Sequence, residues 1–287
     1  MLPKKPKPTR IVAIPSNLFI ETPLREKSLK IGFIARAIAI FRVEKVLLYG
    51  INNTEEEKVN ANILKKILEY LECPQYLRKR FFKKDPALKY AGLLPPLRTP
   101  HHPLKHEKTR YREGIVTAIK GKYALIDVGL EKPVEVIIEE DFRIGNRVLV
   151  ELFYNSRGKV LNAKIADRRE IDVYWGYRVY LAEDLLNAIE KAHADFVVAT
   201  SRWGTLVTKI EREFFDRIKK SKKMLVLFGS QKEGLFEISK KIGVRLEDVT
   251  DFIINFIPEQ GTATVRTEEA ILATFSIINF LNQHSLI

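Results

Sequence analysis

Runs of apolar residues along the chain follow two different periods, and the periods predict strands and helices in turn. Short runs such as IVAIP (11–15) and VLLYG (46–50) are typical of buried strands, whereas residues 24–41 carry apolar positions close to helical spacing. A second amphipathic helix is expected to begin after Thr54 and to end near Pro74. This alternation with short connections is the βαβ signature of a parallel sheet.

The pattern changes in the middle of the chain. Proline becomes dense between Arg78 and Arg112, which disfavours a regular helix or a central strand, so we interpret this stretch as a hinge. From Gly114 to about Ala166, short β-branched runs follow one another, with roughly five strands in about fifty residues. That is the size of a small OB-like β-barrel, a frequent oligonucleotide-binding module.

Strand and helix patterns alternate again after Asp167. The expected elements are a strand and a helix in 175–192, a strand in 195–201, a helix in 209–220, a strand from Leu225, a strand in 253–257 and a closing helix in 265–282. The barrel is therefore expected to be inserted into one α/β domain. We expect a basic arm over 1–9, an α/β domain made of 10–92 and 167–287, and an inserted barrel with its Pro-rich hinge over 93–166.

Composition favours a polyanionic partner and argues against a disulfide, a metal site and a membrane span. Of the 287 residues 46% are apolar, enough for a sizeable core, and 49 Lys and Arg against 36 Asp and Glu give a net charge of +13. This charge favours a polyanionic partner such as RNA. The single Cys73 rules out an internal disulfide, and no Cys or His cluster has metal-ligand spacing. With no secretory signal and no segment that could span a bilayer, we expect a cytoplasmic protein without metal or membrane contact.

Two glycine-bearing turns near the end of the chain carry the candidate chemistry. GSQKEGL (229–235) and PEQGTATV (258–265) each follow an apolar run that predicts a strand. In open α/β sheets, ligands bind beyond the carboxyl ends of strands, where glycine allows close approach to the backbone. Neither turn matches a phosphate-binding fingerprint, so nucleotide hydrolysis and Rossmann-type hydride transfer lose their usual support.

Several segments together resemble a known family. They are GSQKEGL, NFIPEQGTATVRTEEA (255–270) and IGFIARAIAIFRV (31–43), and they resemble the SPOUT class of S-adenosylmethionine-dependent RNA methyltransferases. LRTPHHPLKHE (97–107) and YREGIV (111–116) narrow the resemblance to a branch of archaea and eukaryotes with an inserted OB-like domain. Human members of this branch are regarded as uridine methyltransferases that act at N(3) in large-subunit ribosomal RNA. The resemblance implies a parallel α/β sheet with a C-terminal trefoil knot, and a homodimer.

The resemblance also implies that S-adenosylmethionine lies in the knot, held by the loops after two late strands. Adenine needs an apolar slot with backbone donors and acceptors, which agrees with these loops. Any one of the glycines by itself is better explained as an ordinary turn residue, but their joint occurrence in two matching segments favours the ligand site. The implied cofactor-binding residues are Gly229, Ser230, Gly234, Asn255, Ile257, Pro258, Gly261, Thr262 and Val265.

Arg36 is the candidate catalytic residue. A charge in a run of Ile, Ala and Phe costs free energy unless it is paired or faces an anion, and in related SPOUT enzymes an arginine of this helix works at the active site. A helix-surface arginine or an interface salt bridge is the alternative. Gly32 and Phe33 stand where the ribose-methylating branch has asparagine, so a base nitrogen is the expected acceptor. Glu259 and Glu268 are candidate general bases, although the helix dipole also explains Glu268.

Basic and aromatic residues supply the candidate RNA contacts. Cations neutralise phosphates and aromatic rings stack on bases, although Phe81 and Phe82 are expected to be buried. We expect His101 and His102 to make a hinge contact, since no further metal ligand is near. The alternatives to an enzyme are a non-catalytic RNA-binding or ribosome-assembly factor, and a DNA-binding protein. The proposed RNA-binding residues are Arg78, Lys79, Arg80, Lys83, Lys84, Lys120, Lys122, Tyr123 and Arg266.

Overall fold

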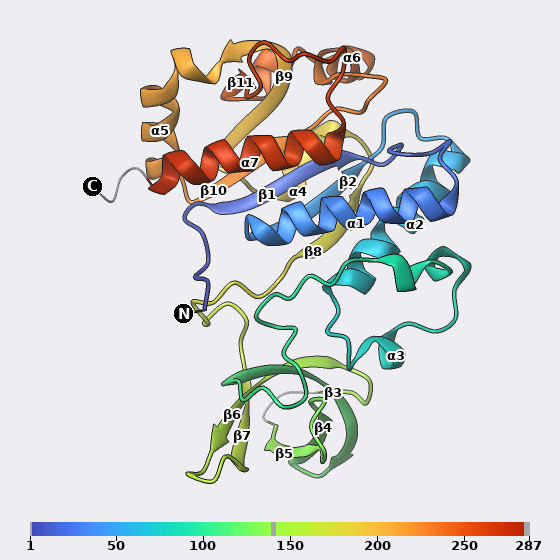
Figure 1. Ribbon diagram of the computed structural model, residues 1–287, viewed down its shortest axis with the longest axis vertical. Helices are drawn as coiled ribbons and strands as arrows, with labels where there is room; N and C mark the ends of the chain where they lie inside the picture. Colours follow the sequence, from blue (N-terminus) through green and yellow to red (C-terminus); the bar gives the residue numbers. More distant parts are fainter. Residues whose placement is uncertain (1, 139–141, 284–287) are drawn as a thin grey trace. The chain divides into compact units, whose positions relative to one another are not determined.

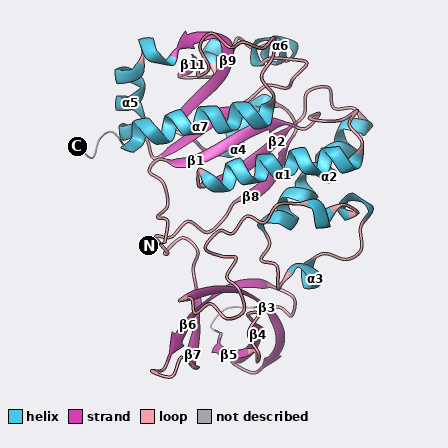
Figure 2. Ribbon diagram, in the orientation of Figure 1, coloured by secondary structure: helices cyan, strands magenta, loops and turns pink. Residues whose placement is uncertain are grey.

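The computed structural model describes residues 2–138 and 142–283 (Figures 1 and 2). By its internal packing the chain divides into two compact units. The parallel-sheet unit comprises Lys5–Leu71, Pro86–Pro96 and the chain from Gly176 onward; the antiparallel-sheet unit comprises the residues up to Lys4, Glu72–Asp85 and Leu97–Trp175. The expected domain boundaries, with the insertion at 93–166, stay a prediction.

The first unit contains a six-stranded sheet in which every neighbouring pair of strands is parallel. Its order is β11-β9-β10-β1-β2-β8. Residues 11–14 of β1 are at most 2% exposed, which explains why this strand is a continuous apolar run. The predicted parallel sheet is thus confirmed. The strands are β1 (Thr9–Pro15), β2 (Val43–Tyr49), β8 (Arg178–Ala182), β9 (Phe196–Leu206), β10 (Lys223–Leu227) and β11 (Phe252–Asn255).

Helices cover both faces of this sheet. Helices α1 (Leu24–Ile40) and α7 (Thr267–Gln283) lie side by side over one face (Figure 1), and the rings of Phe41 and Phe275 stack there at 6.1 Å. On the other face, residues of α4 and α6 pack with alternate residues of β1 and β2. The other helices are α2 (Glu55–Glu72), α4 (Leu185–Ala192), α5 (Glu211–Lys220) and α6 (Leu235–Lys241), with 3-10 turns η1 (Pro86–Leu88), η2 (Ala91–Leu93), η3 (Val207–Lys209) and η4 (Leu246–Asp248).

The second unit is built on a five-stranded antiparallel sheet with the order β5-β4-β3-β6-β7. The edge strands β5 and β7 come close together, so the sheet curls into a near-barrel around a core of Val, Ile and Ala side chains. The five predicted strands are therefore confirmed. They are β3 (Tyr111–Lys120), β4 (Tyr123–Asp127), β5 (Val134–Ile137), β6 (Arg147–Tyr154) and β7 (Val160–Ala166), preceded by the four-residue helix α3 (Arg78–Phe81).

No helix in the described part of the chain has both the length and the apolar character needed to cross a bilayer.

Candidate functional site

A cavity of about 320 Å³ opens where β9, β10 and β11 of the parallel sheet end. Three stretches of backbone line it: residues 200–203 of β9, residues 229–234 after β10, and residues 254–265 from the end of β11 onward. The first turns of α7 close it through Thr267, Ala270 and Thr274. Ligands of open α/β sheets bind at this edge, beyond the carboxyl ends of the strands. The volume is typical of small-molecule sites, which span roughly 300–1,000 Å³.

The cavity, which we call the first cavity, brings together most of the predicted cofactor-binding residues. The other three, Pro258, Gly261 and Thr262, lie in the same segment beside lining residues but do not line the cavity themselves. The mixture of apolar side chains, glycines and small polar groups suits an adenosyl ligand, since adenine stacks on apolar groups while its edge bonds to the backbone. The six predicted residues that line the cavity are Gly229, Ser230, Gly234, Asn255, Ile257 and Val265.

Gly229 has a steric role in its own turn. A Cβ at Gly229 would lie 3.0 Å from the carbonyl oxygen of Glu233 and 3.1 Å from the Cα of Gly234. The turn is tight because the amide of Ser230 donates to the same Glu233 carbonyl at 2.8 Å. Gly261 differs, since no atom lies within 4 Å of the corresponding position. Gly229 therefore serves the turn and lines the cavity, whereas nothing crowds Gly261.

The β9 wall of the cavity is a bulge that the sequence pattern did not predict. Ile253 of β11 pairs with Ala199, but Ile254 pairs with Thr205, so residues 200–204 leave the ladder between them. A Cβ at Gly204 would lie 2.6 Å from the carbonyl oxygen of Ile253, so only glycine fits there. The expected strand at 195–201 consequently continues to Leu206 as β9. A glycine inside a strand pattern was the available signal.

Polar bonds tie this bulge to the segment after β11. The side-chain nitrogen Nδ2 of Asn255 donates to the backbone carbonyl of Arg202 at 3.0 Å, and the Arg202 guanidinium donates to the carbonyl of Ala263 at 2.8 Å. At the neighbouring loop, the Thr267 hydroxyl donates to the carbonyl of Gly229 at 3.3 Å. The three stretches that line the cavity are thus cross-linked into one frame.

Arg36 stands apart from this frame. Its guanidinium donates to the carbonyl of Pro96 at 3.2 Å, and its side chain is half-buried on α1. Gly32, one turn earlier, allows the close approach of this Pro-rich segment, because a Cβ there would lie 2.8 Å from the Pro95 ring. Arg36 does not line the first cavity.

Comparison with known proteins decides the family. The family model described as "Putative RNA methyltransferase" matches residues 9–278. A 28S rRNA (uridine-N(3))-methyltransferase of Homo sapiens is 32% identical over 300 residues, which cover 94% of this chain and 77% of that protein. The chain belongs to this RNA methyltransferase family. The predicted family membership is therefore confirmed.

Other relatives extend the comparison. A 28S rRNA (uridine-N(3))-methyltransferase of Drosophila melanogaster is 34% identical over 310 residues, which cover 96% of this chain. The chain spans 62% of the length of that fly protein. Among solved structures, an rRNA methyltransferase from Sinorhizobium meliloti aligns with 100% of this chain and 59% of its own at 11% identity, and its TM-score of 0.34 supports no conclusion.

A second cavity of about 430 Å³ adjoins the first in this family member, since Ser230 and Thr267 line both. The loops after β1 and β2, the loop after β10 and the start of α7 form its walls. Two predicted residues, Arg266 and Glu268, line it, whereas Glu259 is not among the described residues lining either cavity. Lys30 and Lys232 add positive charge beside several carboxylates. The lining therefore combines cations with carboxylates.

Most of the predicted RNA-binding cations belong to the antiparallel-sheet unit. Lys79, Lys83 and Lys84 are exposed around α3, whereas Arg80 pairs with Asp127 at 3.5 Å and the Arg78 Nε donates to the carbonyl of Cys73 at 3.0 Å. Phe81 and Phe82, which were expected to be buried, are half-buried and pack against a buried cluster. The list is completed by Lys120, Lys122 and Tyr123, which form the exposed turn between β3 and β4, with the Lys122 Nζ 5.6 Å from the centre of the Tyr123 ring.

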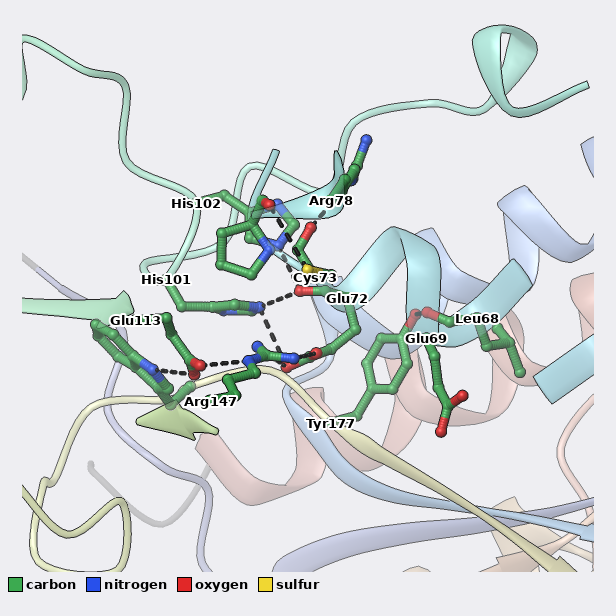
Figure 3. Close-up of polar contacts among 12 residues, drawn as sticks. Leu68, Glu69, Glu72, Cys73, Arg78, His101, His102, Glu113, Arg147 and Tyr177 are labelled. Atoms are coloured by element: carbon green, nitrogen blue, oxygen red, sulfur yellow. Dashed lines mark hydrogen bonds and ion pairs between the residues drawn. The ribbon is translucent and has the colours of Figure 1, made fainter. Parts of the chain in front are cut away.

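The same unit contains a buried ionic cluster (Figure 3). The Arg147 guanidinium lies between two carboxylates: it bonds to Glu72 at 2.8 and 3.3 Å, and its Nε donates to Glu113. Both carboxylate residues are only 5% exposed. The Trp175 indole N–H donates to the other oxygen of Glu113 at 2.8 Å. Although burial alone would lower the pKa of Arg147, the two carboxylates raise it above its ordinary value.

The two hinge histidines complete this cluster. The Nε2 atoms of His101 and His102 both lie within hydrogen-bond distance of the Glu72 carbonyl, at 2.8 and 2.7 Å, so the expected hinge contact is present. Burial lowers the pKa of His102 to about 4, and burial together with His102 and Arg147 lowers the pKa of His101 well below its ordinary value. Both rings are therefore neutral at pH 7. In the described part of the chain, no group of three or more His, Cys, Asp or Glu could hold a metal ion.

Proposed function

We propose that this protein is an S-adenosylmethionine-dependent methyltransferase that modifies N(3) of a uridine in ribosomal RNA. The observation that carries the proposal is the first cavity, which gathers six of the nine predicted cofactor-binding residues at the carboxyl edge of the sheet. Membership of an RNA methyltransferase family and the names of the fly and human relatives support the same reaction.

The residues of the first cavity fit the methyl donor. Bound S-adenosylmethionine would supply an electrophilic methyl group on its sulfonium. Ile257 and Val265 would hold the adenine, while the backbone beside Gly229 and Gly234 offers donors and acceptors to its edge. Such a site works by holding its two reactants in line and excluding water from them.

The second cavity is the proposed site for the acceptor base. It adjoins the first through Ser230 and Thr267, so a base bound there would lie next to the proposed donor site. N(3) of uridine carries a proton that must leave as the nitrogen becomes nucleophilic. Glu268 lines this cavity and is the proposed proton acceptor.

We also propose the SPOUT fold, with its trefoil knot and OB-like insertion. The segment after β11 is tied to the β9 bulge through Arg202 and Ala263, and α7 is tied to the loop after β10 through Thr267 and Gly229, which supports a threaded C-terminal segment. The near-barrel of five antiparallel strands supports the OB-like assignment.

A homodimer through α1 and α7 is the proposed assembly. These neighbouring helices expose apolar side chains, which mark a protein contact when they gather on one face. In such a dimer Arg36, which lies on α1, would reach the first cavity of the partner subunit. This would reconcile its proposed catalytic role with its absence from the first and second cavities. The exposed apolar side chains are Phe33 at 61%, Ile40 at 51%, Leu272 at 46% and Phe280 at 58%.

Calorimetric titration with S-adenosylhomocysteine tests the cofactor site. We expect saturable binding to the wild-type protein and at least a tenfold loss of affinity in Gly229→Val, because the new side chain meets the backbone of Glu233 and Gly234. Gly92→Val is the matched control, since no atom lies within 4 Å of a Cβ there. No saturable uptake by the wild-type protein would favour a non-catalytic RNA-binding or ribosome-assembly factor.

Mass spectrometry of ribosomal RNA nucleosides tests the reaction. RNA from cells that lack the protein should lose N(3)-methyluridine at one site, and the purified protein with S-adenosylmethionine should restore it. Restoration of a different methylated nucleoside would refute the proposed acceptor atom while leaving the methyltransferase assignment in place.

A further inference from the structure

Trp203 is the most exposed large hydrophobic side chain in the described part of the chain, at 71%. The other tryptophan of the protein, Trp175, is 2% exposed. Trp203 belongs to the bulge of β9 and lies on the wall of the first cavity. An indole ring left in water forgoes the stabilisation that burial would give it, and an exposed tryptophan on a cavity wall is typical of a binding surface.

The exposure of Trp203 is a property of a fixed backbone. The amide of Trp203 donates to the Ser201 hydroxyl at 3.1 Å, and the carbonyl and guanidinium of Arg202 are held by Asn255 and Ala263. Gly204 presses the bulge against the backbone of β11. The bulge therefore holds the ring at the entrance of the cavity, as bulges beside active sites commonly re-aim a side chain.

The chemistry around the ring selects a nucleobase. The Arg202 guanidinium carbon lies 4.6 Å from the centre of the Trp203 ring and covers one face of it. The side chain is nevertheless 71% exposed, so the uncovered part of the ring is open to a ligand. Aromatic rings beside cations are the usual platforms for unpaired bases in proteins that bind single-stranded nucleic acid. The net charge of +13 favours a polyanionic partner for the protein as a whole.

We propose that Trp203 stacks on a nucleobase of single-stranded RNA at the entrance of the methyl-donor cavity and so positions the acceptor strand. This rests on the proposed function and adds a residue to it. RNA is favoured over the adenine of the methyl donor, because a ring that is 71% exposed does not form the enclosed slot in which small ligands are buried. It is favoured over a second copy of the chain, because the apolar face proposed for the dimer belongs to α1 and α7.

Fluorescence tests the proposal, because the two tryptophans are so different in exposure. The probe is a short single-stranded oligouridine, added without cofactor to the wild-type protein, with binding measured separately by the anisotropy of end-labelled RNA. We expect quenching of the tryptophan emission that is lost in Trp203→Phe, in which only the buried Trp175 remains. Trp203→Phe should keep most of the affinity, whereas Trp203→Ala should lose about tenfold.

A matched control is Tyr180→Ala. Tyr180 lies on β8 at the other edge of the sheet, is 39% exposed and has the Lys45 Nζ 5.2 Å from its ring centre, yet lines neither described cavity. The affinity of the Tyr180→Ala variant for RNA should stay within about twofold of the wild-type value.

The outcomes separate this inference from the proposed function. RNA binding by anisotropy without any change in emission, or with equal affinity in Trp203→Ala, overturns the stacking platform and leaves the proposed function standing. Quenching by S-adenosylhomocysteine but not by RNA would assign the ring to the cofactor and overturn the proposal. Conversion of a dimer to a monomer by Trp203→Ala would assign the ring to a protein contact and would also overturn it. Failure of the wild-type protein to bind RNA at all overturns both.

Discussion

Replacement of Arg147 by methionine would remove the centre of the buried ionic cluster while keeping much of the apolar stem. Arg147 makes two bonds to Glu72 and one to Glu113, and both carboxylate residues are 5% exposed. Without the guanidinium, two nearly buried carboxylates face each other's charge with little water to solvate them. The variant should therefore weaken the antiparallel-sheet unit rather than the parallel sheet.

The expected loss can be sized from the exposure of these groups. Removing one partner of a buried ion pair costs about 3–5 kcal/mol. The Arg147 side chain is itself 29% exposed, and Arg168 lies 3.9 Å from Glu72, so water and a second cation offset part of the loss. We therefore expect the lower end of this range, about 3 kcal/mol.

Urea unfolding followed by the emission of Trp175 measures this loss, because Trp175 is bonded to Glu113 within the same unit. A Trp203→Phe background makes Trp175 the only tryptophan. Arg169→Met is the matched control: Arg169 pairs with Asp167, but its side chain is 90% exposed, so its loss should stay under about 1 kcal/mol. The reasoning is refuted if Arg147→Met loses no more than this control.

Two further perturbations test the packing around the hinge and the bulge. The pKa of His102 is about 4 in the folded protein and about 6.5 when unfolded, so the unfolded state takes up the proton first. The contribution of His102 to stability should be full above pH 6.5 and fall by about 3 kcal/mol towards pH 4, with a further loss from His101. His102→Gln should reduce this pH dependence in urea titrations, whereas the exposed His106→Gln should not, and equal slopes in all three proteins would contradict the assignment. Gly204→Ala should cost about 1–3 kcal/mol by circular dichroism melts, because its Cβ would meet the backbone of Ile253; a loss no greater than that of Gly92→Ala would mean that the bulge relaxes freely.

The local hydrophobic pattern was sufficient to predict the strands whose side chains are buried in a core. The run at 11–15 predicts β1 because a strand covered on both faces by helices is apolar at every position. The short runs after Gly114 predict five strands because their apolar side chains pack into one core. The two glycine-bearing turns also fell where expected, because parallel strands carry their following loops to the same edge of the sheet.

Other parts of the site depend on partners far away in the sequence. Arg36 has Pro96 as a hydrogen-bond partner, and His101 reaches the backbone of Glu72, so neither contact is visible in a local period. The β9 bulge likewise depends on where β11 pairs, since the register alone decides that residues 200–204 leave the ladder.

The sequence by itself thus determined which segments form strands and helices, the RNA methyltransferase family and the two loops that carry most of the first cavity. Only the tertiary structure decided the strand order, the third wall of the cavity and the exposure of Trp203. The physical reason is that hydrophobic periodicity records whether a side chain is buried, whereas the choice of partner depends on packing between segments that meet only in the folded chain.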